Sequence, residues 1–254
     1  MNDRRRPLVA GNWKMNGLRS ALAELAAMVQ AYDEDLRACV EILVCPPATL
    51  LSAAAHPLIG SGIALGGQDC HAEASGAFTG CISAEMVADA GAAYVLVGHS
   101  ERRCAYAESD VEVRAKAQAA VRAGLEPIVC IGENRQERES GKTFDVLGAQ
   151  VRGSLPDCER LTLAYEPVWA IGSGLTPTVQ EIGEAHRFIR ERAELARPGL
   201  GASTRILYGG SVGPQNAAEL MAASDVDGAL VGGASLTAGS FMAIAEVFRG
   251  RRLE

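Results

Sequence analysis

The chain has 254 residues, of which 48% are hydrophobic and 22% are charged, and its formal net charge at pH 7 is −7. This much apolar material is enough for a large core, and the acidic balance argues against nucleic acid or an anionic membrane surface as the main partner. No apolar run in the sequence approaches the ~18 residues that a membrane-spanning helix needs.

The chain begins with a basic segment, residues 1–6, and the apolar stretch Leu8–Ala10 that follows it is too short for the core of a signal peptide. We therefore expect residues 1–6 to form a short frayed tail. The 7 cysteines are odd in number, have no C-x-x-C spacing, and several lie in apolar runs, such as Cys45 and Cys130. They indicate reduced, mostly buried thiols of a cytoplasmic protein rather than disulfides or zinc ligands.

Short apolar runs alternate with longer helical patterns along the whole chain. The runs predicted to be strands are Leu8–Ala10, Ile42–Cys45, Ile63–Leu65, Tyr94–Val97, Pro127–Ile131, Thr162–Tyr165, Arg205–Tyr208 and Gly228–Val231. Segments rich in Ala, Leu and Glu separate them, for example Ala21–Tyr32, Val111–Arg122 and Val179–Leu195.

Local signals mark the starts of three helices. Capping boxes are predicted where Ser109 precedes Glu112 and where Thr178 precedes Glu181. Pro214 stands where the first position of a helix is expected.

Near-continuous apolar strands separated by helices imply a parallel sheet that is buried on both faces. Strand–helix units of about thirty residues fill positions 1–254 without leaving a linker, which predicts one (β/α)8 barrel domain. The structural alternative is a doubly wound open sheet. That fold normally has a glycine-rich dinucleotide turn after its first strand, and residues 11–16, Gly-Asn-Trp-Lys-Met-Asn, do not supply one.

In such a barrel the residues just after each strand form the catalytic face. Polar or glycine-rich residues follow the strands of this chain at Asn12 and Lys14, residues 98–103, Glu166, residues 209–211 and residues 232–235. Each has an ordinary structural interpretation by itself, such as a solvated lysine, a hydrogen-bonded histidine or a glycine turn. Their coincidence on one rim is what indicates a site.

The residue types on this rim predict proton abstraction beside a carbonyl in a phosphorylated substrate. The glycine turns after strands seven and eight offer unobstructed backbone N–H groups to a phosphate, and Lys14 adds a point charge. Glu166 offers a carboxylate base. His99 precedes a stretch that can begin a helix, and a helix N-terminus disfavours imidazolium, so we expect a neutral imidazole that donates to a developing oxyanion.

Two other chemistries have less support. Gly141-Lys142-Thr143 resembles the end of a P-loop, but Gln136 stands where the first glycine of that motif is needed and the residues before it look helical. The remaining histidines have no metal-ligand spacing, and Cys70-His71 is an adjacent pair, so no metal site is predicted.

The chain closely resembles the triosephosphate isomerase family from Arg6 to its C-terminus. The segments that carry the resemblance are Gly11-Asn12-Trp13-Lys14-Met15-Asn16, the run 97–103 (Val-Gly-His-Ser-Glu-Arg-Arg), the run 164–174 (Ala-Tyr-Glu-Pro-Val-Trp-Ala-Ile-Gly-Ser-Gly), Tyr208-Gly209-Gly210-Ser211-Val212 and the run 231–236 (Val-Gly-Gly-Ala-Ser-Leu). It implies a TIM barrel that interconverts dihydroxyacetone phosphate and D-glyceraldehyde 3-phosphate in glycolysis and gluconeogenesis, without a metal or an organic cofactor.

The resemblance also implies roles for individual residues. Glu166 would be the base and His99 the electrophile that polarises the carbonyl. Lys14 and Asn12 would stabilise the enediolate and the substrate charge, and Glu101 would support the neighbourhood of Lys14 and His99. Backbone groups of four residues in the matching motifs would hold the phosphate, namely Gly172, Ser211, Gly232 and Gly233.

Two segments carry further expectations from the family. Residues Pro167–Thr176 would form a lid, and Gln68–Ile82 would plug into the partner of a homodimer, bringing Thr79 to the other chain's catalytic rim. The sequence departs from the family at Cys81, where an acidic residue is common, and at Leu175 and Pro177 in the lid ending; Pro177 has no N–H to give Tyr208. The alternatives are another phosphate-binding barrel isomerase or epimerase and a non-catalytic phosphate-ligand binding protein.

Overall fold

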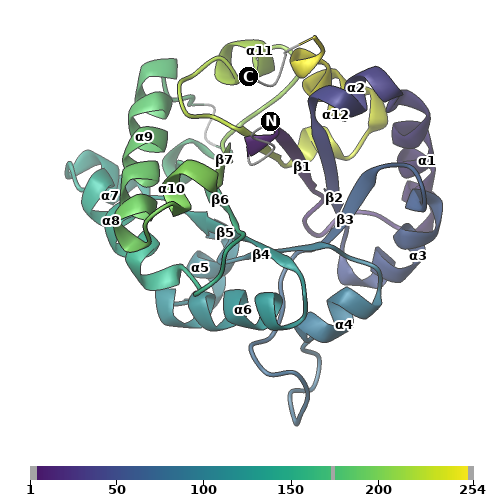
Figure 1. Ribbon diagram of the computed structural model, residues 1–254, viewed down its shortest axis with the longest axis horizontal. Coiled ribbons are helices and arrows are strands. Elements are labelled where there is room, and N and C mark those ends of the chain that lie inside the picture. Colours follow the sequence, from purple (N-terminus) through teal and green to yellow (C-terminus); the bar gives the residue numbers. More distant parts are fainter. Residues whose placement is uncertain (1–4, 173–174, 251–254) are drawn as a thin grey trace.

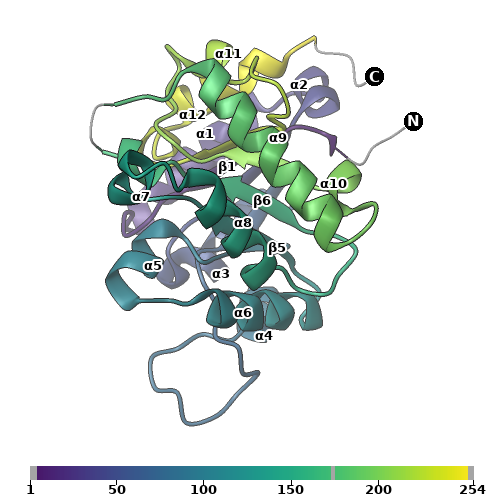
Figure 2. The same cartoon turned by 90° about the vertical axis from the view of Figure 1, so that its left-hand side faces the viewer.

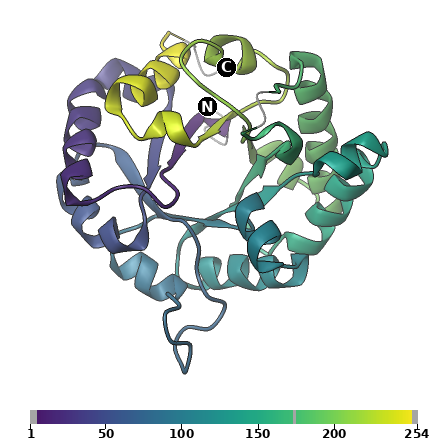
Figure 3. The ribbon, with the colours of Figure 1, turned by 180° about the vertical axis from the view of Figure 1, so that it is seen from behind.

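The computed structural model describes residues 5–172 and 175–250. Its eight strands form one closed barrel in the order β1-β2-β3-β4-β5-β6-β7-β8, and every strand pair is parallel (Figures 1 and 3). The strands are β1 (Leu8–Asn12), β2 (Glu41–Cys45), β3 (Ile63–Gly67), β4 (Tyr94–Val97), β5 (Glu126–Ile131), β6 (Thr162–Tyr165), β7 (Arg205–Tyr208) and β8 (Gly228–Val231). The predicted single (β/α)8 barrel is confirmed.

Helices surround the strands on the outside of the barrel (Figure 1). They are α1 (Leu22–Ala31), α2 (Glu34–Cys39), α3 (Ala48–Leu58), α4 (Ala84–Asp89), α5 (Ser100–Tyr106), α6 (Asp110–Arg122), α7 (Arg135–Glu139), α8 (Thr143–Ser154), α9 (Val179–Ala196), α10 (Leu200–Ser203), α11 (Ala217–Leu220) and α12 (Ala238–Ala245). Short 3₁₀ turns are η2 (Arg19–Ala21), η3 (Val168–Ala170), η4 (Gly233–Ser235) and η5 (Glu246–Phe248).

The local signals for helix starts were right in two cases and wrong in one. Ser109 and Glu112 form a capping box at the start of α6, and Thr178 and Glu181 form one at the start of α9. Pro214 does not occupy a first helical position, because it lies in a turn and α11 begins only at Ala217, after Asn216. The missing N–H of proline is tolerated in a turn as well as in a first helical turn, so the residue alone does not distinguish them.

The core has two layers, because side chains alternate along each strand. Leu8 and Ala10 point into the barrel and pack with inward side chains of the other strands, including Leu96 and Leu207. Val9 points outward into the larger cluster between strands and helices. This two-sided burial explains why the strands are apolar runs without polar alternation.

The closed barrel brings the carboxyl ends of all its strands to one face. Of the loops leaving that face, the one between β3 and α4 stands out from the molecule below α4 and α6 (Figure 2). It contains the predicted Gln68–Ile82 segment, and Phe78 in it is 42% exposed. Among the described residues, no helix is both long and apolar enough to cross a membrane.

Candidate active site

A cavity of about 360 Å³ lies at the carboxyl ends of the strands. Its lining includes eight of the predicted site residues, which are Asn12, Lys14, His99, Glu166, Gly172, Ser211, Gly232 and Gly233. Glu101 lines an adjoining cavity of about 480 Å³, together with Lys14 and His99. The structure therefore brings together residues that are as far apart in the sequence as Asn12 and Gly233.

A larger hollow of about 680 Å³ lies at the opposite end of the barrel, around Arg205. Arg205 is buried there and pairs with Glu41 at 2.7 Å and with Glu126 at 2.8 Å. Its NH2 also donates to the hydroxyl of Tyr94 at 3.0 Å. Because these buried charges satisfy one another, this end of the barrel has a structural explanation, as expected for the amino-terminal face.

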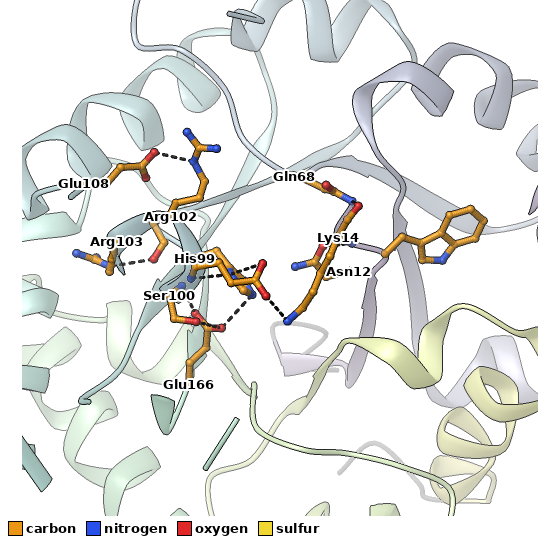
Figure 4. A network of polar contacts seen from close by, with 12 residues as sticks. Asn12, Lys14, Gln68, His99, Ser100, Arg102, Arg103, Glu108 and Glu166 are labelled. Carbon is orange, nitrogen blue, oxygen red and sulfur yellow. Dashed lines mark hydrogen bonds and ion pairs between the residues drawn. The ribbon is translucent and has the colours of Figure 1, made fainter. Parts of the chain in front are cut away.

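Glu166 follows β6 directly and is 1% exposed. Its carboxylate accepts hydrogen bonds from Ser100, whose backbone N–H lies 2.9 Å from Oε2 and whose hydroxyl lies 3.0 Å from Oε1 (Figure 4). Nε2 of His99 lies 3.0 Å from Oε1 of the same carboxylate. The carboxylate is thus buried, and both of its oxygens have hydrogen-bonding partners within the protein.

His99 is the residue that caps α5 at its N-terminus, as the sequence predicted. The backbone N–H of Glu101 donates to Nδ1 of His99 at 3.2 Å. A ring nitrogen that accepts a hydrogen bond carries no proton, so the proton of this imidazole lies on Nε2, the nitrogen that faces Glu166 and the cavity. The helix end thereby prepares a neutral imidazole whose Nε2–H is a donor.

Lys14 has a left-handed backbone, with φ +54°. This conformation costs a non-glycine residue about 1–3 kcal/mol, and neighbouring groups hold it. The N–H of Lys14 donates to Oδ1 of Asn12 at 3.0 Å, and Nε2 of Gln68 donates to the carbonyl of Lys14 at 2.9 Å. The strained turn aims the side chain across the rim, where Nζ lies 2.6 Å from Oε1 of Glu101 (Figure 4).

Glycines that follow β7 and β8 line part of the same cavity as His99. A Cβ added to Gly232 would lie 3.4 Å from Cε of Lys14, so the lysine stem packs against this backbone. A Cβ added to Gly209 would lie 2.9 Å from Cγ of Glu166, and one added to Gly210 would lie 2.2 Å from the hydroxyl of Tyr208. The turn η4 begins at Gly233, and Gly233 and Ala234 line the cavity.

The segment that follows Glu166 is hydrogen-bonded to the buried carboxylate of Glu133. Glu133 is 0% exposed and accepts hydrogen bonds from Nε1 of Trp169 at 2.8 Å and from the hydroxyl of Tyr165 at 3.2 Å. Burial raises the pKa of Glu133. The Arg138 guanidinium lies 4.8 Å from the Trp169 ring centre. These contacts fix the first part of the expected lid, Pro167–Thr176, whereas Ser173 and Gly174 lie outside the described residues.

Sequence reasoning missed several residues that hold the site. Ser100 was part of a motif but received no role, although it binds both oxygens of Glu166. Gln68 was assigned to an interface loop, yet it also bonds the carbonyls of Lys14 and Cys45, each at 2.9 Å. Gln150, which has no sequence signal, bonds both polar backbone groups of Gly132. No local pattern distinguishes a polar side chain that supports a distant backbone group from one that faces solvent.

The family model for triosephosphate isomerase matches residues 7–248 of the chain. The chain belongs to the triosephosphate isomerase family. The triosephosphate isomerase of Afipia carboxidovorans is 59% identical over 244 residues, covering 95% of this chain and 97% of that one. That of Bradyrhizobium diazoefficiens is 56% identical over 249 residues, covering 97% of this chain and 99% of that one.

The likeness extends to three dimensions. A crystal structure of triosephosphate isomerase from Bartonella henselae superposes with a TM-score of 0.89 at 48% identity, covering 96% of this chain and 99% of that chain. Within the part of the chain that the structure describes, no three His, Cys, Asp or Glu side chains are grouped as metal ligands would be.

Proposed function

We propose a catalytic or binding role for each residue of this site in the reaction of an aldose–ketose isomerase. The chain interconverts dihydroxyacetone phosphate and D-glyceraldehyde 3-phosphate through an enediolate, the reaction of its family. The observation that carries the residue assignment is the contact between the Glu166 carboxylate and Nε2 of His99, 3.0 Å apart in the wall of a cavity that Lys14 and the glycine turns also line. A base and an electrophile are adjacent at one place where a carbonyl and its neighbouring C–H fit together.

In this mechanism Glu166 removes a proton from C1 of dihydroxyacetone phosphate. The electrons of the broken C–H bond form the C1–C2 double bond, and the carbonyl oxygen on C2 takes the negative charge. Nε2–H of His99 donates to that oxygen, and the ammonium of Lys14, beside it, lowers the energy of the anion. His99 moves a proton between the two oxygens, and Glu166 returns its proton to C2, which completes the aldose without loss of any atom.

The phosphate would lie at the glycine turns. Gly172, Ser211, Gly232 and Gly233 line the cavity, and their backbone N–H groups are the proposed donors to the phosphate. Asn12 accepts a hydrogen bond from the N–H of Lys14, which lines the same cavity. Because the phosphate donors bind a part of the substrate that does not react, they supply binding energy in the ground state and the transition state alike. Their role is to fix the carbonyl between Glu166 and His99.

We further propose a homodimer that forms through the Gln68–Ile82 loop. The loop stands away from the barrel (Figure 2). Its Phe78 ring packs against His71 with ring centres 4.1 Å apart, yet Phe78 remains 42% exposed. Met15, which is 96% exposed, and Tyr106, which is 71% exposed, line the adjoining cavity of about 480 Å³. Exposed apolar side chains on the loop and beside the cavity would be buried in such a contact, and in a dimer Thr79 would approach the partner's rim.

The cytoplasm, where glycolysis and gluconeogenesis take place, is the proposed location. The free state of all the cysteines is compatible with a reducing compartment.

A coupled assay on both triose phosphates, run with a strong chelator present, tests the activity. Turnover under those conditions supports isomerisation by side chains alone. Phosphate binding without turnover would instead favour a binding protein, and turnover only of larger sugar phosphates would favour another barrel isomerase or epimerase. Sedimentation at micromolar concentration tests the dimer, and a fully active monomer would contradict it.

A further inference from the structure

Gln150 makes two hydrogen bonds to the backbone of one residue, Gly132, behind the active site. It lies on α8, and its Oε1 accepts a hydrogen bond from the N–H of Gly132 at 2.7 Å. Its Nε2 donates to the carbonyl of the same glycine at 3.2 Å. A side-chain amide offers a donor and an acceptor side by side at every pH, whereas a carboxyl group does so only when it is protonated.

Gly132 needs such a partner because β5 ends just before it. The carbonyl of Ile131 accepts from the N–H of Glu166 at 2.8 Å, and the carbonyl of Glu133 accepts from the N–H of Val168 at 3.1 Å. The carbonyls of Ile131 and Glu133 therefore face the segment that contains Glu166. Backbone groups alternate in direction along an extended chain, so the N–H and the carbonyl of Gly132 face the other way, toward α8. Gln150 therefore takes the place that a neighbouring strand would have.

Gly132 is also in the closest possible contact with the backbone of Glu166. A Cβ added to it would lie 1.7 Å from the carbonyl oxygen of Glu166 and 3.2 Å from its Cα. The two backbones touch without any intervening side chain. A shift of Gly132 toward or away from the barrel axis must therefore move Glu166, or open a gap beneath it.

We infer that Gln150 is a positioning residue for the base, acting on Glu166 through the Gly132 peptide. Glu166, Ser100, Gly132 and Gln150 line one cavity of about 460 Å³ on the outer side of the base. The substrate cavity lies on the inner side and includes neither Gln150 nor Gly132 in its lining. The inference rests on the proposed role of Glu166 and adds a residue that never touches the substrate.

The location of Gln150 predicts a selective kinetic effect. The phosphate site at Ser211, Gly232 and Gly233 belongs to other strands, so loss of the Gln150 contacts should leave ground-state binding intact. The base alone would be displaced, and a displacement of about 1 Å between reacting groups costs up to about 100-fold in rate. A change in kcat without a change in phosphate affinity distinguishes this role from general destabilisation.

The first experiment compares Gln150→Met with Gln118→Met. Methionine has nearly the shape of glutamine but cannot make either bond, and Gln118 is an exposed residue of α6 whose replacement controls for the substitution itself. We expect kcat to fall about 10- to 100-fold in Gln150→Met, with the inhibition constant of inorganic phosphate unchanged within about twofold. The Gln118→Met variant should match the wild type.

A second variant, Gln150→Glu, keeps the acceptor for the N–H of Gly132 and loses the donor to its carbonyl. When the introduced carboxyl is protonated, its O–H replaces the lost donor. The ratio of its kcat to that of the wild type should therefore rise at least about threefold as the pH falls from 8 to 5. The ratio is used because both proteins contain the same other titratable groups around this cavity. These groups are Arg103, Cys104, Glu108, Asp110, Glu137 and Glu166.

Several results would overturn the inference. A kcat of Gln150→Met within twofold of the wild type would do so, as would a parallel loss of phosphate affinity or a flat ratio for Gln150→Glu. A crystal structure of Gln150→Met provides a reading independent of activity: we expect the contacts of 2.9 and 3.0 Å between Ser100 and Glu166 to change, and an unchanged Glu166 would contradict us. Absence of wild-type turnover would refute the proposed reaction and leave this structural test standing.

Discussion

Ser100 binds both carboxylate oxygens of Glu166, with its backbone N–H 2.9 Å from Oε2 and its hydroxyl 3.0 Å from Oε1. These bonds belong to a buried, charge-assisted pair, and each such bond stabilises the position by about 1.5–3 kcal/mol. The Glu166 carboxylate is thus held at the start of α5. Substrate binding must offer at least comparable interactions, since otherwise the carboxylate would remain with Ser100.

The first prediction concerns Glu166→Gln. The amide cannot abstract a proton at neutral pH, whereas the glycine turns that hold phosphate are untouched, so kcat should fall by at least about 1,000-fold. The inhibition constant of inorganic phosphate should change by less than about threefold. Steady-state kinetics in both directions measure this, with Glu219→Gln on the exposed face of α11 as the control. Comparable turnover by Glu166→Gln would transfer the role of base to another residue.

A second prediction separates charge from shape at Lys14. Lys14→Ala should weaken phosphate binding and turnover together, because substrate and enediolate are anionic throughout the reaction. Lys14→Arg keeps the charge, but a planar fork replaces a compact ammonium that packs against Gly232 and pairs with Glu101 at 2.6 Å. We expect kcat/KM of Lys14→Arg to stay at least about tenfold below the wild type. Full activity would reduce Lys14 to a nonspecific source of positive field.

The strands were predictable from sequence because their side chains are buried on both faces. Four of them, β4, β6, β7 and β8, have the predicted bounds, whereas β1 and β3 continue two residues further than the apolar runs. The extensions end in residues such as Asn12 and Gly67, whose types argue against a strand. They pair because a neighbouring strand supplies partners, as Cys45 does for Asn12. Hydropathy in one strand contains no information on where its neighbour ends.

The residues that line the cavity at the strand ends were also predictable as a group, since motifs at those ends contain them and the barrel brings the ends together. What the sequence did not reveal was support from a distance. Gln68 holds Lys14 across 54 positions, and Ser100 holds Glu166 across 66. Such contacts depend on packing in three dimensions, and an isolated Gln or Ser has no periodicity that would indicate it.

A third prediction follows from His186, which is fully buried between α9 and the barrel. Burial lowers the pKa of His186 to about 4, and its Nδ1 lies 3.2 Å from the carbonyl of Asp225. Below pH 6.5 the unfolded chain therefore binds a proton that the folded chain does not, and stability falls as the pH decreases toward 4. Integration gives a loss of about 2 kcal/mol between pH 7 and pH 5.

Urea unfolding at several pH values measures that loss. His186→Asn removes the titrating ring but keeps an N–H near the Asp225 carbonyl, so its stability should be lower at pH 7 and should vary less between pH 7 and pH 5. His56→Asn, at an exposed position of α3, is the matched control and should keep the wild-type dependence. An equal pH dependence in wild type and His186→Asn would show that other groups control acid stability.

The last prediction tests the contact between Gly132 and Glu166 directly. In Gly132→Ala the new Cβ would lie 1.7 Å from the carbonyl oxygen of Glu166, and no rotamer change can relieve this clash because the backbone fixes the position of the Cβ and the oxygen is itself a backbone atom. The strands must separate, so we expect a loss of at least about 3 kcal/mol in the free energy of unfolding. We also expect kcat to fall more than it does in Gln150→Met, since the alanine displaces the base instead of only releasing it.

Gly239→Ala provides the control for that substitution. Gly239 lies near the start of α12, is exposed, and would have no atom within 4 Å of an added Cβ. Alanine there should stabilise the helix by about 0.5 kcal/mol, because glycine loses more backbone entropy on folding. Thermal unfolding and steady-state kinetics of both variants suffice. If Gly132→Ala kept wild-type stability and kcat, the backbone contact beneath Glu166 would not be rigid, and neither Gly132 nor Gln150 could control the position of the base.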